Sequence, residues 1–277
     1  MNCRNGPSIR KISEYNLKEK EQARKNWIGR QKRNSKGTLM TVIDYYNRNK
    51  IRIRFEDEKH YEKDVCTSAF CKGNVSNPYD KTVFGVGVVG ESNTICKKNE
   101  HKQKLSYLRW VGILERCYSP KRGPNHKTYS DCTVCEEWLF YPNFEKWFNE
   151  NYYKIPGCRM DIDKDIKIKG NKVYSPDACL IVPSAINMLP ISRKSARNGV
   201  IGTHISENGR FEACHNVCEN GVVKRLHLGT YNTADEAFKH YKESKKTWIV
   251  KVANKYKQYM PKSVYEVVIN YEVDIND

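Results

Sequence analysis

Residues 199–244, GVIGTHISENGRFEACHNVCENGVVKRLHLGTYNTADEAFKHYKES, have the pattern of a complete small module. Asn208-Gly209 and Asn220-Gly221 are strong hairpin signals, because the central residues of such turns tolerate positive φ angles. Apolar and polar residues alternate around these turns, which predicts three short antiparallel strands. Thr233 and Glu236 then form a capping box, followed by apolar residues at helical spacing. We therefore expect a sheet with one face covered by a helix and the other face polar and basic.

Four motifs follow one another in this module: Gly199-Val200, Gly209-Arg210-Phe211-x-Ala213, Leu228-Gly229-Thr230-Tyr231-x-Thr233 and Glu236-Ala237-x-x-x-Tyr241. Together they resemble the Apetala-type DNA-binding domain of plant ethylene-response factors, which also occurs in phage and mobile-element proteins. The resemblance implies that the sheet lies in the major groove of duplex DNA. The side chains it places against DNA are Arg210, Asn216, Lys224, Arg225 and His227. The alternative is a small sheet module that binds nothing.

The charge of the chain favours a polyanionic partner. Its 277 residues leave room for two or three domains, and 49 basic against 32 acidic residues give a net charge of +17. Ribosomal, RNA-binding and membrane-surface proteins have the same composition, so the charge alone does not single out DNA. Residues 1–36 carry eleven Lys and Arg against three Glu. Their apolar residues are sparse, which predicts a mobile basic arm.

Cysteine content and hydropathy indicate an intracellular protein. No apolar run approaches the length of a membrane span, and no signal-peptide pattern is present. The eleven cysteines are scattered and odd in number, which favours reduced thiols over a disulfide framework. We expect no membrane partner and no small-molecule substrate. If a phage encodes the chain, the host cytoplasm is its expected location.

Residues 37–95 are rich in strand signals. Thr38–Tyr45 and Ile51–Phe55 predict two strands joined by a turn, and Val83–Gly90 closes the segment. Gly85, Gly87 and Gly90 match a dinucleotide-binding spacing, but no strand–helix–strand unit surrounds them. The phrases GTLMTVIDYYNRNKIRIRF and FCKGNVSNPY resemble a small β-barrel-like repeat of phage proteins, which implies a targeting or docking module.

Residues 105–192 contain a different pattern. Tyr107–Tyr118 predicts a helix with an aromatic stripe, and a second helix is expected through Phe144–Phe148. The phrases W…RCY, VCEEW, DKDI, KGNKVYSP and VP..IN occur in this order. They resemble the HNH (ββα-metal) nucleases of phages and group I introns. Next to an Apetala-like module, they imply an architecture of the phage homing-endonuclease type.

The catalytic positions implied by this resemblance are degenerate. Lys164 stands where the family has its general-base histidine, and a protonated lysine cannot accept a proton at neutral pH. Ala178 replaces the middle asparagine, whereas Asn187 keeps its expected type. The resemblance thus gives Asp163, Lys164 and Asn187 as the catalytic positions. The oxygen-rich run of Asp161, Asp163 and Asp165 could hold Mg²⁺.

A structural zinc site is a further possibility in this segment. Cys132-x-x-Cys135 is half of a zinc-ribbon pattern, and Cys117 and Cys179 lie in the same predicted domain. A second C-x-x-C is absent, and buried reduced thiols are the alternative.

The sequence therefore predicts an α+β, multidomain protein. A small β-rich N-terminal module precedes an HNH-like α+β centre, an Apetala-like sheet and helix at 197–258, and a tail at 259–277. We expect a phage or mobile-element protein that binds double-stranded DNA through its basic C-terminal sheet. One alternative is a Mg²⁺-dependent site-specific homing or nicking endonuclease, and another is an inhibitor that binds a host protein.

Overall fold

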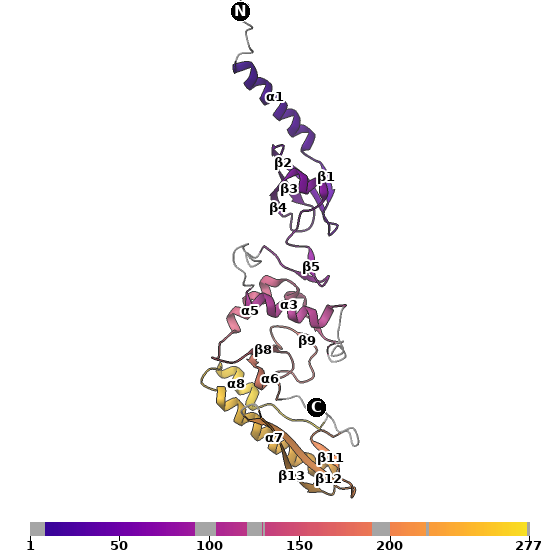
Figure 1. Ribbon diagram of the computed structural model, residues 1–277, viewed down its shortest axis with the longest axis vertical. Helices are drawn as coiled ribbons and strands as arrows, with labels where there is room; N and C mark the ends of the chain where they lie inside the picture. Colours follow the sequence, from indigo (N-terminus) through magenta and orange to yellow (C-terminus); the bar gives the residue numbers. More distant parts are fainter. Residues whose placement is uncertain are drawn as a thin grey trace, which may run out of the picture. The chain divides into compact units, whose positions relative to one another are not determined.

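The computed structural model describes residues 9–91, 104–120, 129, 131–189, 200–219 and 222–275, with side chains from residue 17 onward. Helices and antiparallel strands occur in several small sheets, which confirms the expected α+β, multidomain class (Figure 1). The chain divides into two compact units, Met1–Ile95 and Cys96–Asp277. The predicted HNH-like and Apetala-like domains therefore belong to one unit.

The N-terminal unit is built on a four-stranded antiparallel sheet, β1–β2–β3–β4. Its strands are β1 (Gln31–Arg33), β2 (Leu39–Asn47), β3 (Lys50–Phe55) and β4 (Glu62–Val65). Alternation along β3 buries Ile51, Ile53 and Phe55 completely, as its period-two pattern predicted. The helix α2 (Thr67–Lys72) adds Phe70 to this core, and the hairpin β5 (Lys81–Val83) and β6 (Gly87–Val88) follows.

Most of the predicted N-terminal arm forms a helix, α1 (Ile9–Trp27). Between residues 17 and 27, every side chain is exposed except those of Ala23 and Trp27, which pack against the core of the sheet. The ring of Trp27 stacks on that of Tyr45, with centroids 6.3 Å apart. The expectation that these residues form no folded element was therefore wrong. Two apolar residues four apart on one helix face suffice to attach the end of the helix to the sheet.

The first part of the second unit packs aromatic helices against two short strand pairs. Its helices are α3 (Leu105–Tyr118), α4 (Glu136–Leu139), α5 (Tyr141–Asn151) and α6 (Ser184–Asn187). The antiparallel pair is β8 (Met160–Asp163) with β10 (Leu180–Pro183), and the parallel pair is β7 (Thr133–Val134) with β9 (Val173–Tyr174). Trp110, Trp138 and Tyr141 are completely buried, and Trp110 Nε1 donates to the carbonyl of Trp138 at 2.7 Å. The predicted aromatic helix is confirmed.

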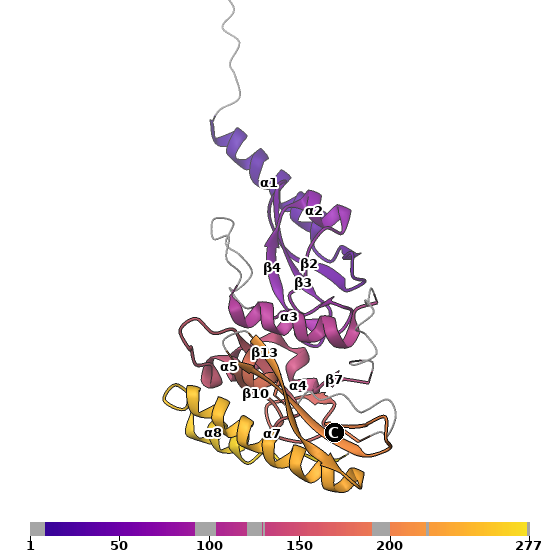
Figure 2. The same cartoon turned by 60° about the horizontal axis from the view of Figure 1, so that its bottom comes forward.

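The C-terminal part is a three-stranded antiparallel sheet covered by a long helix. The strands are β11 (Thr203–Ile205), β12 (Phe211–Glu219) and β13 (Val222–Tyr231), and the helix is α7 (Ala234–Tyr256). Thr233 caps α7, because its Oγ1 accepts from the backbone N–H of Glu236 at 3.2 Å. Figure 2 shows α7 lying along the β12–β13 hairpin. The predicted sheet, turn at Gly209 and capped helix are present, whereas the predicted turn at 220–221 lies outside the described residues.

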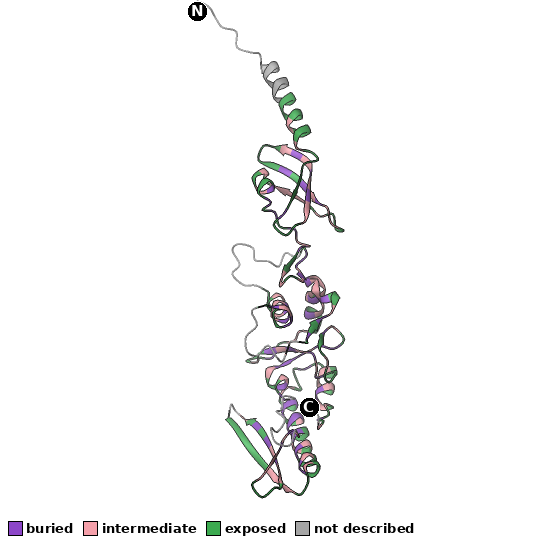
Figure 3. Cartoon of the chain, turned by 90° about the vertical axis from the view of Figure 1, so that its right-hand side faces the viewer, coloured by how far each residue is buried: buried purple, intermediate pink, exposed green. Residues whose placement is uncertain are grey.

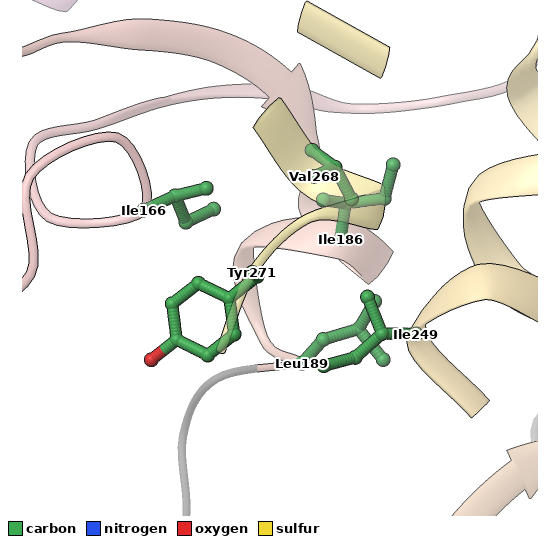
Figure 4. A pocket seen from close by; sticks show the side chains of 6 residues that line it. All are labelled: Ile166, Ile186, Leu189, Ile249, Val268 and Tyr271. Carbon is green, nitrogen blue, oxygen red and sulfur yellow. The ribbon is translucent and has the colours of Figure 1, made fainter. Parts of the chain in front are cut away.

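The end of the chain also differs from the prediction. Residues 259–277, expected as a tail, include the helix α8 (Lys262–Ile269). Val268 of α8 and Ile249 of α7 meet Ile186 of α6 around a shared apolar hollow (Figure 4). The hollow measures about 10 Å³, which is close to the smallest cavity that admits one water molecule. It is therefore a packing contact rather than a ligand site, and it joins the sheet-bearing helix to the part of the unit that contains α3–α6.

Candidate nucleic-acid interface

The register of β12 and β13 decides which side chains share a face of the sheet. Directly opposed residues of an antiparallel pair point to the same side. Asn216 lies opposite Arg225, and both are exposed, whereas Lys224 lies opposite the buried Val217. Arg225 therefore belongs to the face away from α7, and Lys224 belongs to the other face. Lys224 and Arg225, both predicted to contact DNA, therefore point to opposite sides of the sheet, as adjacent strand residues do.

We call the uncovered side of this sheet the outer face. Its members include His204, Glu212, Cys214, Asn216, Cys218, Arg225 and His227, and Arg210, directly before β12, continues the same alternation. Four of the five side chains predicted to contact DNA thus lie on one face. Figure 3 shows how much of β13 is exposed.

A β-bulge sets this arrangement. Ala213 pairs with Gly229, but the next residue, Cys214, pairs with His227, so Leu228 is left without a partner across the sheet. The extra residue reverses which side chains of β13 point to each side of the sheet, and thereby brings His227 and Arg225 to the outer face. Gly229 has φ +132°, and a Cβ there would lie 2.6 Å from the hydroxyl of Tyr231. That hydroxyl donates to the carbonyl of the unpaired Leu228 at 2.8 Å.

Polar contacts hold several outer-face side chains in place. His204 Nε2 lies 2.7 Å from Glu212 Oε2, and Arg225 Nη2 lies 3.2 Å from His204 Nδ1. Arg210 Nη2 donates to the carbonyl of Thr230 at 3.1 Å. Each guanidinium has five N–H donors, so both arginines retain donors for a ligand. The face consequently presents oriented donors rather than loose cations.

His215 lies on the opposite side and is almost completely buried, at 2 % exposure. Its Nδ1 is 3.0 Å from Ser244 Oγ, and among the described residues its Nε2 has no hydrogen-bond partner. Burial, with a smaller effect of Lys245, lowers the pKa of His215 to about 4. The imidazole is therefore neutral and belongs to the core between the sheet and α7, where it packs edge-on to Tyr241.

Two of the predicted catalytic positions, Asp163 and Lys164, have structural contacts near the end of β8. Lys164 is buried and forms an ion pair with Asp165 at 2.9 Å. Burial acts to lower the pKa of Lys164, but the hydrogen bond and charge of Asp165 outweigh it and raise the pKa. Lys164 is therefore a fixed cation and not a base. Asn187 makes no hydrogen bond to Asp163 or Lys164 among the described contacts.

The three aspartates predicted to hold Mg²⁺ serve different partners. Asp163 Oδ1 accepts the backbone N–H groups of Asp165 and Ile166 at 2.9 and 2.6 Å. Burial and the neighbouring Asp165 raise the pKa of Asp163 to about 6. Asp161 instead accepts from Ser184 and forms an ion pair with Arg159 at 3.0 Å. Burial acts to raise the pKa of Asp161, but these two partners outweigh it and lower the pKa. The three carboxylates do not form a preassembled cation site.

The cysteines predicted as zinc ligands do not assemble either. Burial raises the pKa of the Cys132 and Cys135 thiols, and it raises that of Cys179 to about 12. Cys117 is buried as well. Within the described ranges, the one group of metal-ligand side chains with all its atoms within 4.8 Å of one another lies elsewhere, on the outer face of the sheet.

That group is His204, Glu212 and Cys214, which sequence reasoning missed. A signal for it was present. A hairpin turn centred on Asn208 pairs residue 204 with residue 212, and residue 214 lies on the same strand face. The grouping of His204, Glu212 and Cys214 could therefore have been derived from the register of the turn.

Comparison with other proteins adds no further assignment. No known protein family, curated protein or solved structure matches this chain. Across the described parts of the chain, the structure contains no helix both long and apolar enough to span a membrane.

Proposed function

We propose that this protein binds duplex DNA by inserting the outer face of the β11–β12–β13 sheet into the major groove. The observation that supports this most directly is the register, which gathers Asn216, Arg225 and His227 on one exposed face while α7 covers the other. A two-stranded ribbon fits the major groove, which is about 12 Å wide. The net charge of +17 supplies phosphate attraction that does not depend on sequence.

The chemistry of the face suits base readout. Arginine donates two hydrogen bonds to the O6 and N7 atoms of guanine, and asparagine pairs in the same way with N6 and N7 of adenine. Arg225 and Asn216 lie directly opposite each other across the two strands, so they would read neighbouring bases. Arg210, directly before β12, would contact a phosphate or a more distant base.

Arg225 and Lys224 provide a matched test. The full-length protein would first select a preferred site from a random duplex library, and fluorescence anisotropy would then measure its affinity for that site and for unrelated DNA. We expect Arg225→Ala to cost about 1–3 kcal/mol on the selected site and little on unrelated DNA. Lys224→Ala removes a neighbouring exposed charge from the other face and should cost much less. Equal losses for the two variants would contradict the proposal.

We further propose that a phage or mobile element encodes this protein and that it acts in the host cytoplasm. Its action would then be occupancy of DNA, as a regulator or a factor in host takeover. The sequence resemblances of the central and C-terminal segments support this setting.

A Mg²⁺-dependent nuclease is the second candidate, favoured by one observation. The antiparallel pair β8–β10 runs directly into α6, which is the strand–strand–helix order of HNH enzymes. The ion pair of Lys164 argues against efficient catalysis, because a general base contributes about 10²–10⁴-fold to the rate. Incubation with supercoiled plasmid and Mg²⁺, with EDTA as the control, decides between occupancy and cleavage. We expect little or no nicking, and robust cleavage abolished by Asp163→Ala would establish the nuclease.

A further inference from the structure

The outer face carries a set of side chains that DNA readout does not require. His204 on β11 pairs with Glu212 on β12, and Cys214 follows two residues later on the same face. The ligand atoms of these three residues all lie within 4.8 Å of one another. The side chains of His204 and Glu212 are 35 % and 28 % exposed, so an ion could reach them from solvent.

The β-bulge adds a fourth candidate to this set. Because Cys214 is opposite His227, the thiol lies 4.0 Å from His227 Nδ1. Without the bulge, Leu228 would stand opposite Cys214, and the imidazole of His227 would point to the side of α7. Three strands thus contribute two imidazoles, one carboxylate and one thiol to one patch of surface.

The donor set indicates the class of ion. Imidazole, thiolate and carboxylate together are ligands of Zn²⁺, whereas Mg²⁺ and Ca²⁺ take oxygen ligands. Tetrahedral zinc with bonds of about 2.0–2.3 Å holds its ligand atoms about 3.3–3.8 Å apart. His204 Nε2 and Glu212 Oε2, now 2.7 Å apart, would separate slightly, and the Cys214 thiol would approach them. These changes are side-chain rotations on a fixed sheet.

We propose that His204, Glu212 and Cys214 bind one Zn²⁺-class ion on the outer face, with His227 as the fourth ligand. On binding, the Cys214 thiol releases its proton to solvent. Arg225 lies 3.2 Å from a ring nitrogen of His204, and the guanidinium must move away when that ring ligates the ion. The proposal stands independently of DNA binding, because it concerns the protein and the metal alone.

Cobalt substitution of the reduced full-length protein tests this site. Co²⁺ bound by a thiolate in tetrahedral geometry gives intense visible d–d bands and a sulfur-to-metal charge-transfer band in the near ultraviolet. Zn²⁺ should bleach both as it displaces Co²⁺. Cys214→Ser and Cys218→Ser form a matched pair, because Cys218 lies on the same strand face as Cys214 but outside the cluster. Cys132→Ser controls for the buried thiols of the part that contains α3–α6.

We expect the charge-transfer band to vanish in Cys214→Ser and to persist in Cys218→Ser and Cys132→Ser. His227→Ala should retain the charge-transfer band with weaker binding, because it removes one of four ligands and not the thiolate. Circular dichroism of each variant confirms that the sheet is folded. The absence of a tetrahedral cobalt spectrum, or an equal loss of the band in Cys218→Ser or Cys132→Ser, would overturn the proposal.

Discussion

At the scale of single residues, His215 makes the stability of the fold depend on pH. Its pKa is lowered to about 4 by burial, below its ordinary value of 6.5. Between these values the unfolded chain binds a proton that the folded chain does not. The free energy of unfolding is therefore unaffected by this group above about pH 6.5, and it decreases as the pH falls from there towards 4. We expect a loss of about 2 kcal/mol between pH 7 and pH 5.

Urea unfolding of the protein and of His215→Leu at both pH values measures this contribution. The difference between the two proteins matters, because other groups titrate in the same range. Asp163 acts in the opposite direction, since its raised pKa makes the folded chain bind more protons than the unfolded chain. That effect is common to both proteins and cancels. Identical pH dependence in the two would show that the pKa of His215 is the same in the folded and the unfolded chain.

At the scale of elements, the packing of β11 against α7 depends on a glycine. Gly202 has φ +70°, and a Cβ there would lie 2.0 Å from a ring carbon of Tyr241. Gly209, in the turn before β12, has φ +77°, and no atom lies within 4 Å of where its own Cβ would be. Both changes to alanine add backbone strain of about 1–2 kcal/mol, but only Gly202→Ala also forces α7 away from the sheet.

We therefore expect Gly202→Ala to destabilise the protein by about 1–3 kcal/mol more than Gly209→Ala. Thermal unfolding of the two variants under identical conditions measures the difference. Similar melting temperatures would mean that Tyr241 can rotate away at little cost, and that the contact does not hold the helix on the sheet.

At the scale of the whole molecule, the net positive charge predicts that the affinity for DNA decreases steeply with salt concentration. Each phosphate contact contributes about −0.9 to the slope of log affinity against log salt concentration. Lys18, Lys20 and Lys25 of α1 are exposed, so replacing all three with glutamine should flatten the slope if they contact phosphates. Lys59, Lys72 and Lys81 are exposed in the same unit outside α1, and their triple replacement is the control. Anisotropy titrations at several salt concentrations measure the slope for each triple variant. Equal slopes for the two variants would show that these lysines of α1 do not contact phosphates.

The sequence predicted those features that local patterns determine. Alternation gave the strands, and Thr233 with Glu236 gave the start of α7. The bulge at Leu228 escaped prediction because it depends on packing across strands, and without it Arg225 and His227 could not be assigned to the outer face. The anchoring of α1 depends on Trp27 alone among large side chains, too weak a periodic signal to reveal a helix. The cluster at His204 required the register of the first hairpin.

The two halves of α7 are buried against different parts of the protein, which limits how the sheet can be transplanted. Ala237 and Tyr241, near its start, are buried beside the sheet, whereas Ile249 lines the hollow shared with α6 and α8. A cassette cut at residues 197–258 would carry the second half of α7 into water with its apolar side uncovered. Chimeras that transplant the sheet to another protein would therefore need α8 and the part that contains α3–α6 as well, or polar replacements along that half of the helix.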